Sequence, residues 1–420
     1  MQTYDEMVDT ELAYLGKIPR SWQLTPASML FTENKQNNQS LISQIPLQFK
    51  MGDIIRKKVD IDDKLLEEIR RYTVVEKGDI MMNGLNLNYD FATQRVALVG
   101  EGGCITPAYI SLRTRENYSP KYATYLLKAL DGQKVLNGWG TGIRLTLNYT
   151  EFKKYRLPKP DIKIQQQIAD FLDQETAKID NLIAKQERLL ELLEEKRRAT
   201  ITHAVTRGLN PSVELKETNI PWLGKVPEHW KVVRISRIFA ENKDSNNDLG
   251  SLEPMKYKFG TIVPKNVKIT EETQDELRRY NLIQPDDIMI NGLNLNYDFV
   301  TQRVAVVEHY GCMTPAYISI RKRNSDVITG YYTYLLKALD SQKVLNGWGT
   351  GIRLTLNYSE LKKKEVLYPP IAEQSSIVEL LDSYIKKTSI LESKIQTQIK
   401  LLKERRTSLI SHAVTGKVRI

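Results

Sequence analysis

Hydrophobic and polar residues follow two different patterns along this chain, and each pattern occurs twice. Over residues 18–160, short runs rich in Val, Ile and Tyr, such as RVALV at 95–99, lie between clusters of Gly and Asn. This pattern predicts a mixed α/β domain with a substantial twisted sheet. The apolar spacing also predicts one helix over residues 122–131 and its copy over 331–340.

The second pattern predicts a long helix that starts at residue 165 and continues to about residue 206. Its apolar residues keep the three-four spacing of a heptad seam, with two polar interruptions. The seam comprises Ile168, Leu172, Ile179, Leu182, Leu189 and Leu193, interrupted by Glu175 and Gln186. Its copy comprises Ile377, Leu381, Tyr384, Leu391, Ile395 and Leu402, interrupted by Thr388 and Gln398.

Each helical stretch has about 40 residues and would be roughly 60 Å long. Neither has an apolar face broad enough to cover a globular core, so we expect the two helices to pair along their seams. The alternative is an ordinary core helix, but the length without Pro or Gly favours a coiled coil. The predicted order is domain, long helix, domain, long helix. Connecting both domains then requires the two helices to run antiparallel, with one domain at each end.

The chain contains an internal repeat, in which one sequence unit occurs twice. NGLNLNYDF at residues 83–91 recurs unchanged at 291–299, and TPAYIS at 106–111 recurs at 314–319. After a one-residue insertion, KVLNGWGTGIRLTLNY at 134–149 recurs unchanged at 343–358. A period of about 208 residues indicates a duplicated pair of domains rather than a solenoid of short repeats.

Composition narrows the class of protein. Of 420 residues, 41% are hydrophobic and 27% are charged, as in globular proteins, and the formal net charge of +10 favours a polyanionic partner. No stretch is apolar enough to span a bilayer, and residues 1–6 do not resemble a signal peptide, so we expect a cytoplasmic protein without a membrane partner. The two cysteines, Cys104 and Cys312, occupy equivalent positions and are expected to be packed thiols.

Motifs for catalysis or for cofactor binding are not found. There is no Walker A sequence and no Asn/Asp-Pro-Pro-Tyr/Phe motif for amino methylation, and no Cys/His cluster has zinc-ligand spacing. GWGTG at residues 138–142 lacks the strand, helix and acidic residue of a dinucleotide-binding loop. We therefore expect no catalytic residue, no cofactor-binding residue and no metal ligand in this chain.

Several sequence motifs and their order along the chain resemble those of the specificity subunit of type I restriction-modification enzymes. Each unit opens with Gly-x-Ile/Val-Pro-x-x-Trp, at residues 16–22 and 224–230. Each predicted domain ends in a Pro-rich phrase that leads into Gln-x-x-Ile-x-x-x-Leu-Asp, at 165–173 and 374–382. Each helix closes with a basic turn and Ala-Val-Thr. The resemblance covers essentially the whole chain.

The resemblance implies two α/β target-recognition domains, separated by a pair of long antiparallel helices. The expected boundaries are 1–160 and 211–369 for the recognition domains, and 161–210 and 370–420 for the spacer helices. The implied partners are double-stranded DNA, two modification subunits that methylate adenine, and restriction subunits. S-adenosylmethionine, ATP and Mg would then be held by those partners, and this chain would not itself be catalytic.

Two duplicated segments carry the candidate DNA contacts. Amide side chains can pair with adenine edges, Tyr can stack or bond a phosphate, and Arg can bind guanine or phosphate. The candidates are Asn83, Asn86, Asn88, Tyr89, Asn137, Thr141 and Arg144, with the copies Asn291, Asn294, Asn296, Tyr297, Asn346, Thr350 and Arg353. The alternatives are a tight turn at 83–91 and a structural loop with Trp139 packed inward at 134–149. Gln94 and Arg95 are weaker candidates, because Arg95 adjoins an apolar strand and could be a support.

Because these segments are identical, two domains related by a pseudo-two-fold axis would read the same bases on opposite strands. The expected target is therefore close to an interrupted palindrome, unless divergent stretches such as 34–47 and 242–255 also touch bases. Two other functions remain open at this point. One is a methyltransferase or nuclease whose motif is not recognisable, and the other is an adaptor that binds no DNA.

Overall fold

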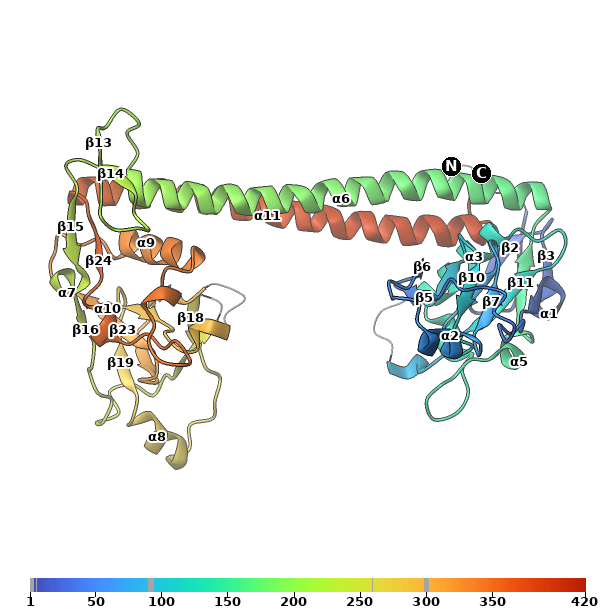
Figure 1. Cartoon of the computed structure of the whole chain (residues 1–420), viewed down its shortest axis with the longest axis horizontal. Coiled ribbons are helices and arrows are strands. Elements are labelled where there is room, and N and C mark those ends of the chain that lie inside the picture. The colour runs from blue at the N-terminus through green and yellow to red at the C-terminus, as the bar shows by residue number, and fades with distance from the viewer. Residues whose placement is uncertain (1–3, 5, 90–93, 259, 298–301) are drawn as a thin grey trace. The chain divides into compact units, whose positions relative to one another are not determined.

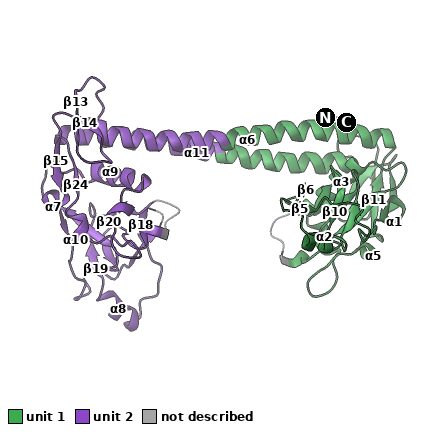
Figure 2. Cartoon of the chain, in the orientation of Figure 1, with its two compact units in different colours: residues 1–187, 396–420 green, residues 188–395 purple. Residues whose placement is uncertain are grey.

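The computed structural model of the chain describes all residues except 1–3, 5, 90–93, 259 and 298–301 (Figure 1). The chain divides into two compact units. Unit 1 comprises residues 1–187 and 396–420, and unit 2 comprises residues 188–395 (Figure 2). Two long helices, α6 (Ile162–Arg207) and α11 (Ile371–Val414), each contribute to both units.

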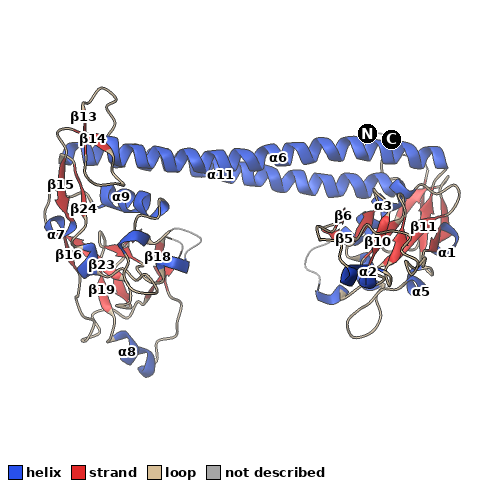
Figure 3. Cartoon of the chain, viewed as in Figure 1, coloured by secondary structure: helices blue, strands red, loops and turns tan. Residues whose placement is uncertain are grey.

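Unit 1 is built on a four-stranded antiparallel sheet. Its order is β4 (Phe31–Glu33), β11 (Ile110–Thr114), β8 (Ile80–Met82) and β9 (Val96–Leu98). Every residue of the inner strand β8 is buried, which explains its continuous apolar sequence. Helices and strands are mixed within the unit, as the sequence predicts (Figure 3).

Helix α3 (Pro120–Gly132) packs against β9 and connects the sheet to the long helices. Ser119 caps its first turn by accepting a hydrogen bond from the N–H of Tyr122, and Pro120 occupies the position where a missing N–H costs nothing. On the side facing α6, the Tyr125 hydroxyl donates to Asp173 at 2.8 Å. The predicted helix over 122–131 is confirmed, with slightly wider bounds.

Shorter elements complete the unit. The strand pairs are β1 (Met7–Asp9) with β2 (Lys17–Pro19), β3 (Gln23–Pro26) with β12 (Arg156–Lys159), β5 (Leu47–Lys50) with β6 (Asp53–Arg56), and β7 (Thr73–Val75) with β10 (Gly103–Ile105). The short helices are α1 (Ala27–Leu30), α2 (Asp63–Ile69), η1 (Leu87–Tyr89), α4 (Val135–Gly138) and α5 (Tyr149–Phe152).

Unit 2 repeats this architecture, as the internal repeat predicts. Its four-stranded sheet has the order β16 (Phe239–Glu241), β23 (Ile318–Lys322), β20 (Ile288–Ile290) and β21 (Val304–Val306). The strand pairs are β13 (Leu215–Glu217) with β14 (Lys225–Pro227), β15 (Lys231–Arg234) with β24 (Glu365–Tyr368), β17 (Met255–Lys258) with β18 (Thr261–Pro264), and β19 (Asn281–Ile283) with β22 (Gly311–Met313). The helices are α7 (Ile235–Ile238), α8 (Glu271–Leu277), η2 (Leu295–Tyr297), α9 (Thr329–Ser341), η3 (Asn346–Trp348) and α10 (Tyr358–Leu361).

The long helices run antiparallel within each unit. In unit 1, Asp180 of α6 pairs with Arg406 of α11 at 2.8 Å, and Glu187 pairs with Lys403 at 3.5 Å. Rising numbers on α6 therefore meet falling numbers on α11. In unit 2, Arg197 pairs with Glu392 at 3.5 Å. Among the described residues, no helix is long and apolar enough to cross a membrane.

The domain core extends onto both helices. In unit 1, the apolar cluster beneath α3 includes Ile168 and Leu172 of α6 together with Ile410 and Val414 of α11. The Tyr122 hydroxyl donates to the Val414 carbonyl at 3.0 Å inside this cluster. In unit 1 the ends of both long helices are thus part of the core of the α/β domain.

The predicted seam is correct at some positions and wrong at others. The predicted residues that are buried are Ile168, Leu172, Ile179, Ile377, Leu381 and Ile395. Leu182, Leu189 and Leu391 are instead 43–48% exposed, whereas Ile183 and Ile399, which the prediction left out, are buried. The sequence offers two adjacent apolar stripes on each helix, because a residue and its neighbour lie only about 100° apart around the axis. Packing selected the stripe that continues from Leu172 through Thr176 and Ile179.

Candidate nucleic-acid interface

The first candidate segment forms a compact loop directly after the buried strand β8. We call residues 83–89 the asparagine loop. The side-chain oxygen of Asn83 accepts the N–H of Leu85 at 3.1 Å, which sets a turn at the start of the loop. Asn86 has a φ of 50°, a left-handed conformation that Asn tolerates well. The predicted tight turn is therefore present, and it presents asparagine side chains from a fixed backbone.

Arg95 supports the asparagine loop from below. Its side chain is buried, and its guanidinium donates hydrogen bonds to the carbonyl oxygens of three loop residues. The acceptors are Asn83 at 3.0 Å, Leu85 at 2.7 Å and Asn86 at 3.2 Å. The loop residues Asn86 and Asn88 are exposed. The interpretation of Arg95 as a support agrees with this geometry.

Asp131, at the end of α3, holds the segment that carries Arg95. One carboxylate oxygen accepts the backbone N–H of Gln94 at 2.7 Å and that of Arg95 at 2.8 Å. Asp131 is 1% exposed, so this carboxylate replaces water for two otherwise unsatisfied donors. Asp131 was not predicted from the sequence. The available signal was an acidic residue, Asp131 and Asp340, at the same place in both copies of an apolar helix.

The second candidate segment ends in a tight hairpin, residues 140–146, which we call the glycine hairpin. Thr141 and Thr146 exchange both backbone hydrogen bonds, at 3.1 and 2.8 Å. Between them, Gly142 has a φ of 77° and Leu145 a φ of 40°, so the chain reverses through two left-handed residues. Thr141 and Arg144 are exposed at this tip.

The asparagine loop and the glycine hairpin form one surface, although more than fifty positions separate them. The N–H of Leu87 donates to the Leu145 carbonyl at 3.0 Å, and the N–H of Leu147 donates to the Gly84 carbonyl at 2.8 Å. A side chain at position 84 would overlap the Leu147 carbonyl, so this approach requires glycine. Finally, the Asn88 amide donates to the Ile143 carbonyl at 3.3 Å.

Trp139 is buried beneath this surface. Its ring stacks on Tyr155 with centroids 3.9 Å apart and meets Tyr14 edge-on at 5.3 Å. The alternative interpretation, with Trp139 packed inward, is therefore confirmed for this side chain. It does not remove the exposed hairpin tip, which begins two residues later.

Unit 2 has the same surface, held by the equivalent hydrogen bonds. Arg303 donates to the carbonyls of Asn291, Leu293 and Asn294 at 3.0, 2.7 and 3.3 Å. Thr350 and Thr355 close the second glycine hairpin, residues 349–355, and Asn296 donates to the Ile352 carbonyl at 3.4 Å. The chain thus presents the same built surface twice.

The structure separates the predicted contact residues into two groups. The exposed group comprises Asn86, Asn88, Thr141 and Arg144, with Asn294, Asn296, Thr350 and Arg353. The half-buried group comprises Asn83, Asn137, Asn291 and Asn346. Asn137 and Asn346 donate their side-chain amides to the carbonyls of Leu87 and Leu295, inside the protein. The side chains of Tyr89 and Tyr297, and residues 90–91 and 298–299 of the predicted segments, lie outside the described residues.

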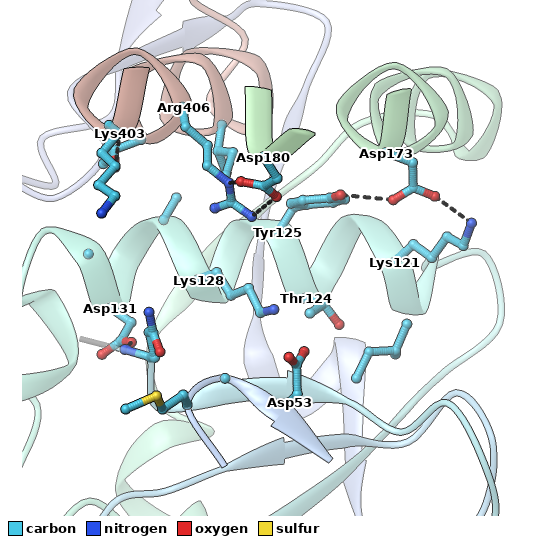
Figure 4. A pocket seen from close by; sticks show the side chains of 18 of the residues that line it. Asp53, Lys121, Thr124, Tyr125, Lys128, Asp131, Asp173, Asp180, Lys403 and Arg406 are labelled. Carbon is cyan, nitrogen blue, oxygen red and sulfur yellow. Dashed lines mark hydrogen bonds and ion pairs between the residues drawn. The ribbon is translucent and has the colours of Figure 1, made fainter. Parts of the chain in front are cut away.

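Unit 1 also contains a cavity of about 620 Å³ between α3, the β5–β6 hairpin and the long helices (Figure 4). Several of its charges form ion pairs: Lys121 of α3 pairs with Asp173 of α6 at 2.6 Å, and Arg406 of α11 pairs with Asp180 of α6. Lys128 projects into it, and burial lowers the pKa of Lys128. We assign this cavity a packing role.

The remaining titratable candidates also lack catalytic geometry. Cys104 and Cys312 are fully buried, and burial raises the pKa of both thiols to about 11, so both are packed as predicted. Within the described residues, no group of three or more His, Cys, Asp or Glu side chains could hold a metal ion.

A family model and several known proteins match most of the length of this chain. The family model for the type I restriction modification DNA specificity domain matches residues 95–192 and 227–401, which is more than half of the chain. The chain is 22% identical to the MjaX specificity subunit of a type I restriction enzyme from Methanocaldococcus jannaschii, over 97% of this chain and 96% of that protein. It is 20% identical to the EcoKI specificity subunit of Escherichia coli, over 96% and 90%.

Solved structures share the fold. One, from work on complex assembly and conformational transition of the type I R-M system, has a TM-score of 0.65 at 15% identity, covering 96% of this chain and 99% of that chain. The HsdS subunit from Thermoanaerobacter tengcongensis has a TM-score of 0.55 at 14% identity, covering 96% and 98%. At these identities the likeness is one of fold.

Proposed function

The chain belongs to the type I restriction modification DNA specificity family, and from this premise we propose that its two asparagine loops and two glycine hairpins read a bipartite DNA target. The observation that carries the proposal is the duplication of one built surface. Two loops distant in sequence are joined by backbone hydrogen bonds, from Leu87 to Leu145 and from Leu147 to Gly84. Buried Arg95 and Asp131 support the asparagine loop, and the same contacts recur around Arg303 and Asp340. A surface of this kind, with exposed amides and a guanidinium, suits base edges and phosphates.

The exposed and half-buried residues would then have different roles. Asn86, Asn88, Thr141 and Arg144, with their copies, are the proposed DNA contacts. Asn83 and Asn137 act as positioning residues, because their side chains are half-buried and bond the backbone of the asparagine loop. Asn88 also bonds the Ile143 carbonyl, but its side chain is exposed. The domain boundaries proposed from sequence remain 1–160 and 211–369 for recognition, with spacers 161–210 and 370–420.

We expect the target to be close to an interrupted palindrome. The contact residues are identical in both units, so each half-site would present the same core bases on opposite strands. Mapping methylated adenines in cells with and without the gene tests this directly. A shared inverted core in the two half-sites is the expected result. Two unrelated half-sites would instead assign base reading to the divergent stretches, such as 34–47 and 242–255.

The proposed partners are two modification subunits that methylate adenine, and restriction subunits. Exposed leucines on the long helices, Leu182, Leu189, Leu192 and Leu391, offer apolar area for such docking. In this proposal S-adenosylmethionine, ATP and Mg bind those partners, and this chain selects the sequence without performing chemistry. A chain that binds S-adenosylmethionine when purified alone would contradict this division of labour.

An adaptor that binds no DNA remains the second function to test. A gel-shift assay with the modification partner, with and without this chain, separates the two. We expect weak, salt-sensitive binding by the chain alone and strong site-specific binding in the complex, since the partners add phosphate contacts. Equal binding by the modification partner in the absence of the chain would favour the adaptor.

A further inference from the structure

The most exposed large apolar side chains of the described residues occupy the same position in both units. Ile143 and Ile352 are each 98% exposed, at the tips of the two glycine hairpins. Single exposed apolar residues are common on surfaces and need no explanation by themselves. Here, however, the same residue is exposed almost completely at the same point of two identical hairpins, next to Arg144 and Arg353.

Hydrogen bonds fix the backbone around Ile143. The Thr141–Thr146 bridge closes the hairpin behind it, and the Leu145 N–H donates to the Gly142 carbonyl at 3.0 Å. The Ile143 carbonyl itself accepts the Asn88 amide at 3.3 Å. Leu145 is held at a φ of 40°, a conformation that costs energy for a side chain of this kind. An isoleucine is therefore projected outward from a fixed, strained turn.

The base of the hairpin is equally fixed. Gly140 leaves room for Leu87, because a Cβ at this position would lie 2.8 Å from the Leu87 methyl group. Leu87 is buried, so the asparagine loop locks the hairpin from below. The tip cannot fold back to cover Ile143 without breaking these contacts. Nothing in the part of the chain that the structure describes covers this side chain.

We propose that Ile143 and Ile352 are wedges that insert between stacked bases of the two half-sites, an inference that rests on the proposed DNA-binding function. Proteins that kink duplex DNA use single apolar side chains in this way, inserted between base steps while cationic side chains hold the flanking phosphates. The tip supplies both parts, because exposed Arg144 follows Ile143 directly. Asn86 and Asn88, on the adjoining loop, would contact the bases beside the opened step.

Insertion would also add sequence preference without a hydrogen bond. Pyrimidine–purine steps unstack most easily, so a wedge favours targets that carry such a step at a fixed position in each half-site. The wedge and its copy should therefore mark one flexible step per half-site. This deepens the proposed readout, in which amides and guanidinium groups select bases by hydrogen bonding.

The test uses the complete chain in complex with its modification partner. Duplexes carry the sequence that this complex methylates on plasmid DNA, with 2-aminopurine placed at each purine in turn. We expect fluorescence to rise at one step in each half-site apart from the methylated adenine, which base-flipping enzymes extrude by themselves. Ile143→Ala should abolish the rise in one half-site, and Ile352→Ala in the other. Ile143→Leu should retain it, since a leucine can also wedge.

Met29→Ala provides the matched control, because Met29 is 65% exposed in unit 1 but lies outside both the duplicated segments and the divergent stretch 34–47. It should leave the fluorescence pattern unchanged. If Ile143→Ala binds the site with an unchanged 2-aminopurine pattern, the wedge is wrong while the proposed function stands. If Ile143→Ala instead weakens association with the modification subunit, Ile143 is a protein contact and the wedge is again overturned. If the unaltered complex binds no duplex site-specifically, the proposed function and the wedge are lost together.

Discussion

The guanidinium of Arg95 donates a 2.7 Å hydrogen bond to the carbonyl oxygen of Leu85, and Arg303 makes the same bond to Leu293. In each unit this bond joins the start of a core strand to the loop proposed to meet DNA. The side chain that bonds the loop is buried and charged. Arg95 bonds three carbonyls of the loop from a buried position, so its effect on the loop conformation can be tested separately from the exposed amides.

Arg95→Lys should destabilise unit 1 although the charge is retained. Lysine cannot reach three carbonyls in a fork, so buried acceptors lose their donors. We expect the free energy of unfolding in urea to fall by about 2–3 kcal/mol, and DNA binding to fall as the asparagine loop loosens. Arg144→Lys is the control, since Arg144 is exposed and the same substitution there should leave the unfolding curve unchanged. Equal stability of the two variants would contradict the support role.

Gly84→Ala should damage the surface through the backbone. The added methyl group would overlap the Leu147 carbonyl, so the asparagine loop and the segment after the glycine hairpin must separate. We expect a stability loss on the order of 2–3 kcal/mol, measured by denaturant titration, with a loss of DNA affinity. Gly138→Ala tests the same change in open space, where nothing lies within 4 Å of the new Cβ. If Gly138→Ala is as damaging as Gly84→Ala, close approach is not the reason for glycine at 84.

Arg144→Ala and Arg353→Ala should weaken DNA binding without affecting folding. A lost contact of this kind costs about 1–3 kcal/mol of binding free energy, and the salt dependence distinguishes its target. If Arg144 binds a phosphate, the slope of log affinity against log salt falls by about one for each arginine removed. If it binds guanine, the slope changes little and specificity at one base pair relaxes. Unchanged affinity and specificity would exclude the tip as a DNA contact.

Lys128→Met should stabilise the protein at neutral pH. Burial lowers the pKa of Lys128 in the folded chain, so the unfolded chain binds this proton more tightly than the folded chain does. Below the lowered pKa both states are protonated and the full cost of the buried charge is present. The cost decreases as pH rises from the lowered pKa toward the usual value of about 10.4.

Thermal unfolding of both chains between pH 7 and 10 measures this effect. The advantage of Lys128→Met should be largest at pH 7 and smallest at pH 10. Lys121→Met on the same helix is the comparison, because Lys121 is ion-paired with Asp173, which raises the pKa of Lys121. Its loss should be slightly destabilising instead. A destabilised Lys128→Met variant would mean that the neighbouring carboxylates outweigh burial.

Lengthening both long helices should lengthen the gap between half-sites. Four residues add about 6 Å and roughly one turn, which corresponds to about two base pairs of DNA. The insertions belong between Glu187 and Arg197 in α6 and between Glu392 and Lys403 in α11. Insertion in α6 alone would shift at least one of the pairs Asp180–Arg406, Glu187–Lys403 and Arg197–Glu392 out of register. Methylome mapping should return unchanged half-sites with a longer gap. Altered half-site bases with a fixed gap would contradict the role of the helices as a spacer.

The duplication and the long helices could be predicted from sequence because both depend on local pattern. The helix over 122–131 follows from apolar spacing, and the repeat from identical segments. The stripe used by the long helices could not be predicted, since Leu182 and Ile183 are both apolar and only packing decides between them. Nor could the joining of residues 83–89 to 140–146, because it depends on contacts between segments far apart in the chain, such as Leu87 with Leu145.

Burial also decided which predicted contacts face solvent. Asn86 and Asn137 are indistinguishable by residue type, yet one is exposed and the other donates its amide to the Leu87 carbonyl. The role of Asp131 was equally hidden, because its partners are backbone N–H groups that no side-chain pattern reveals.

The carboxylate of Asp131 has a consequence for the timing of recognition. It caps the N–H groups of Gln94 and Arg95 from the last turn of α3, while Arg95 bonds the asparagine loop. These amides can exchange with deuterium only when the end of α3 separates from the strand, so helix, strand and loop should open as one cooperative segment. Slow and matching exchange at 94–95 and in the last turn of α3 would follow. DNA would then meet a surface that is already formed, and association would not wait for a loop to fold.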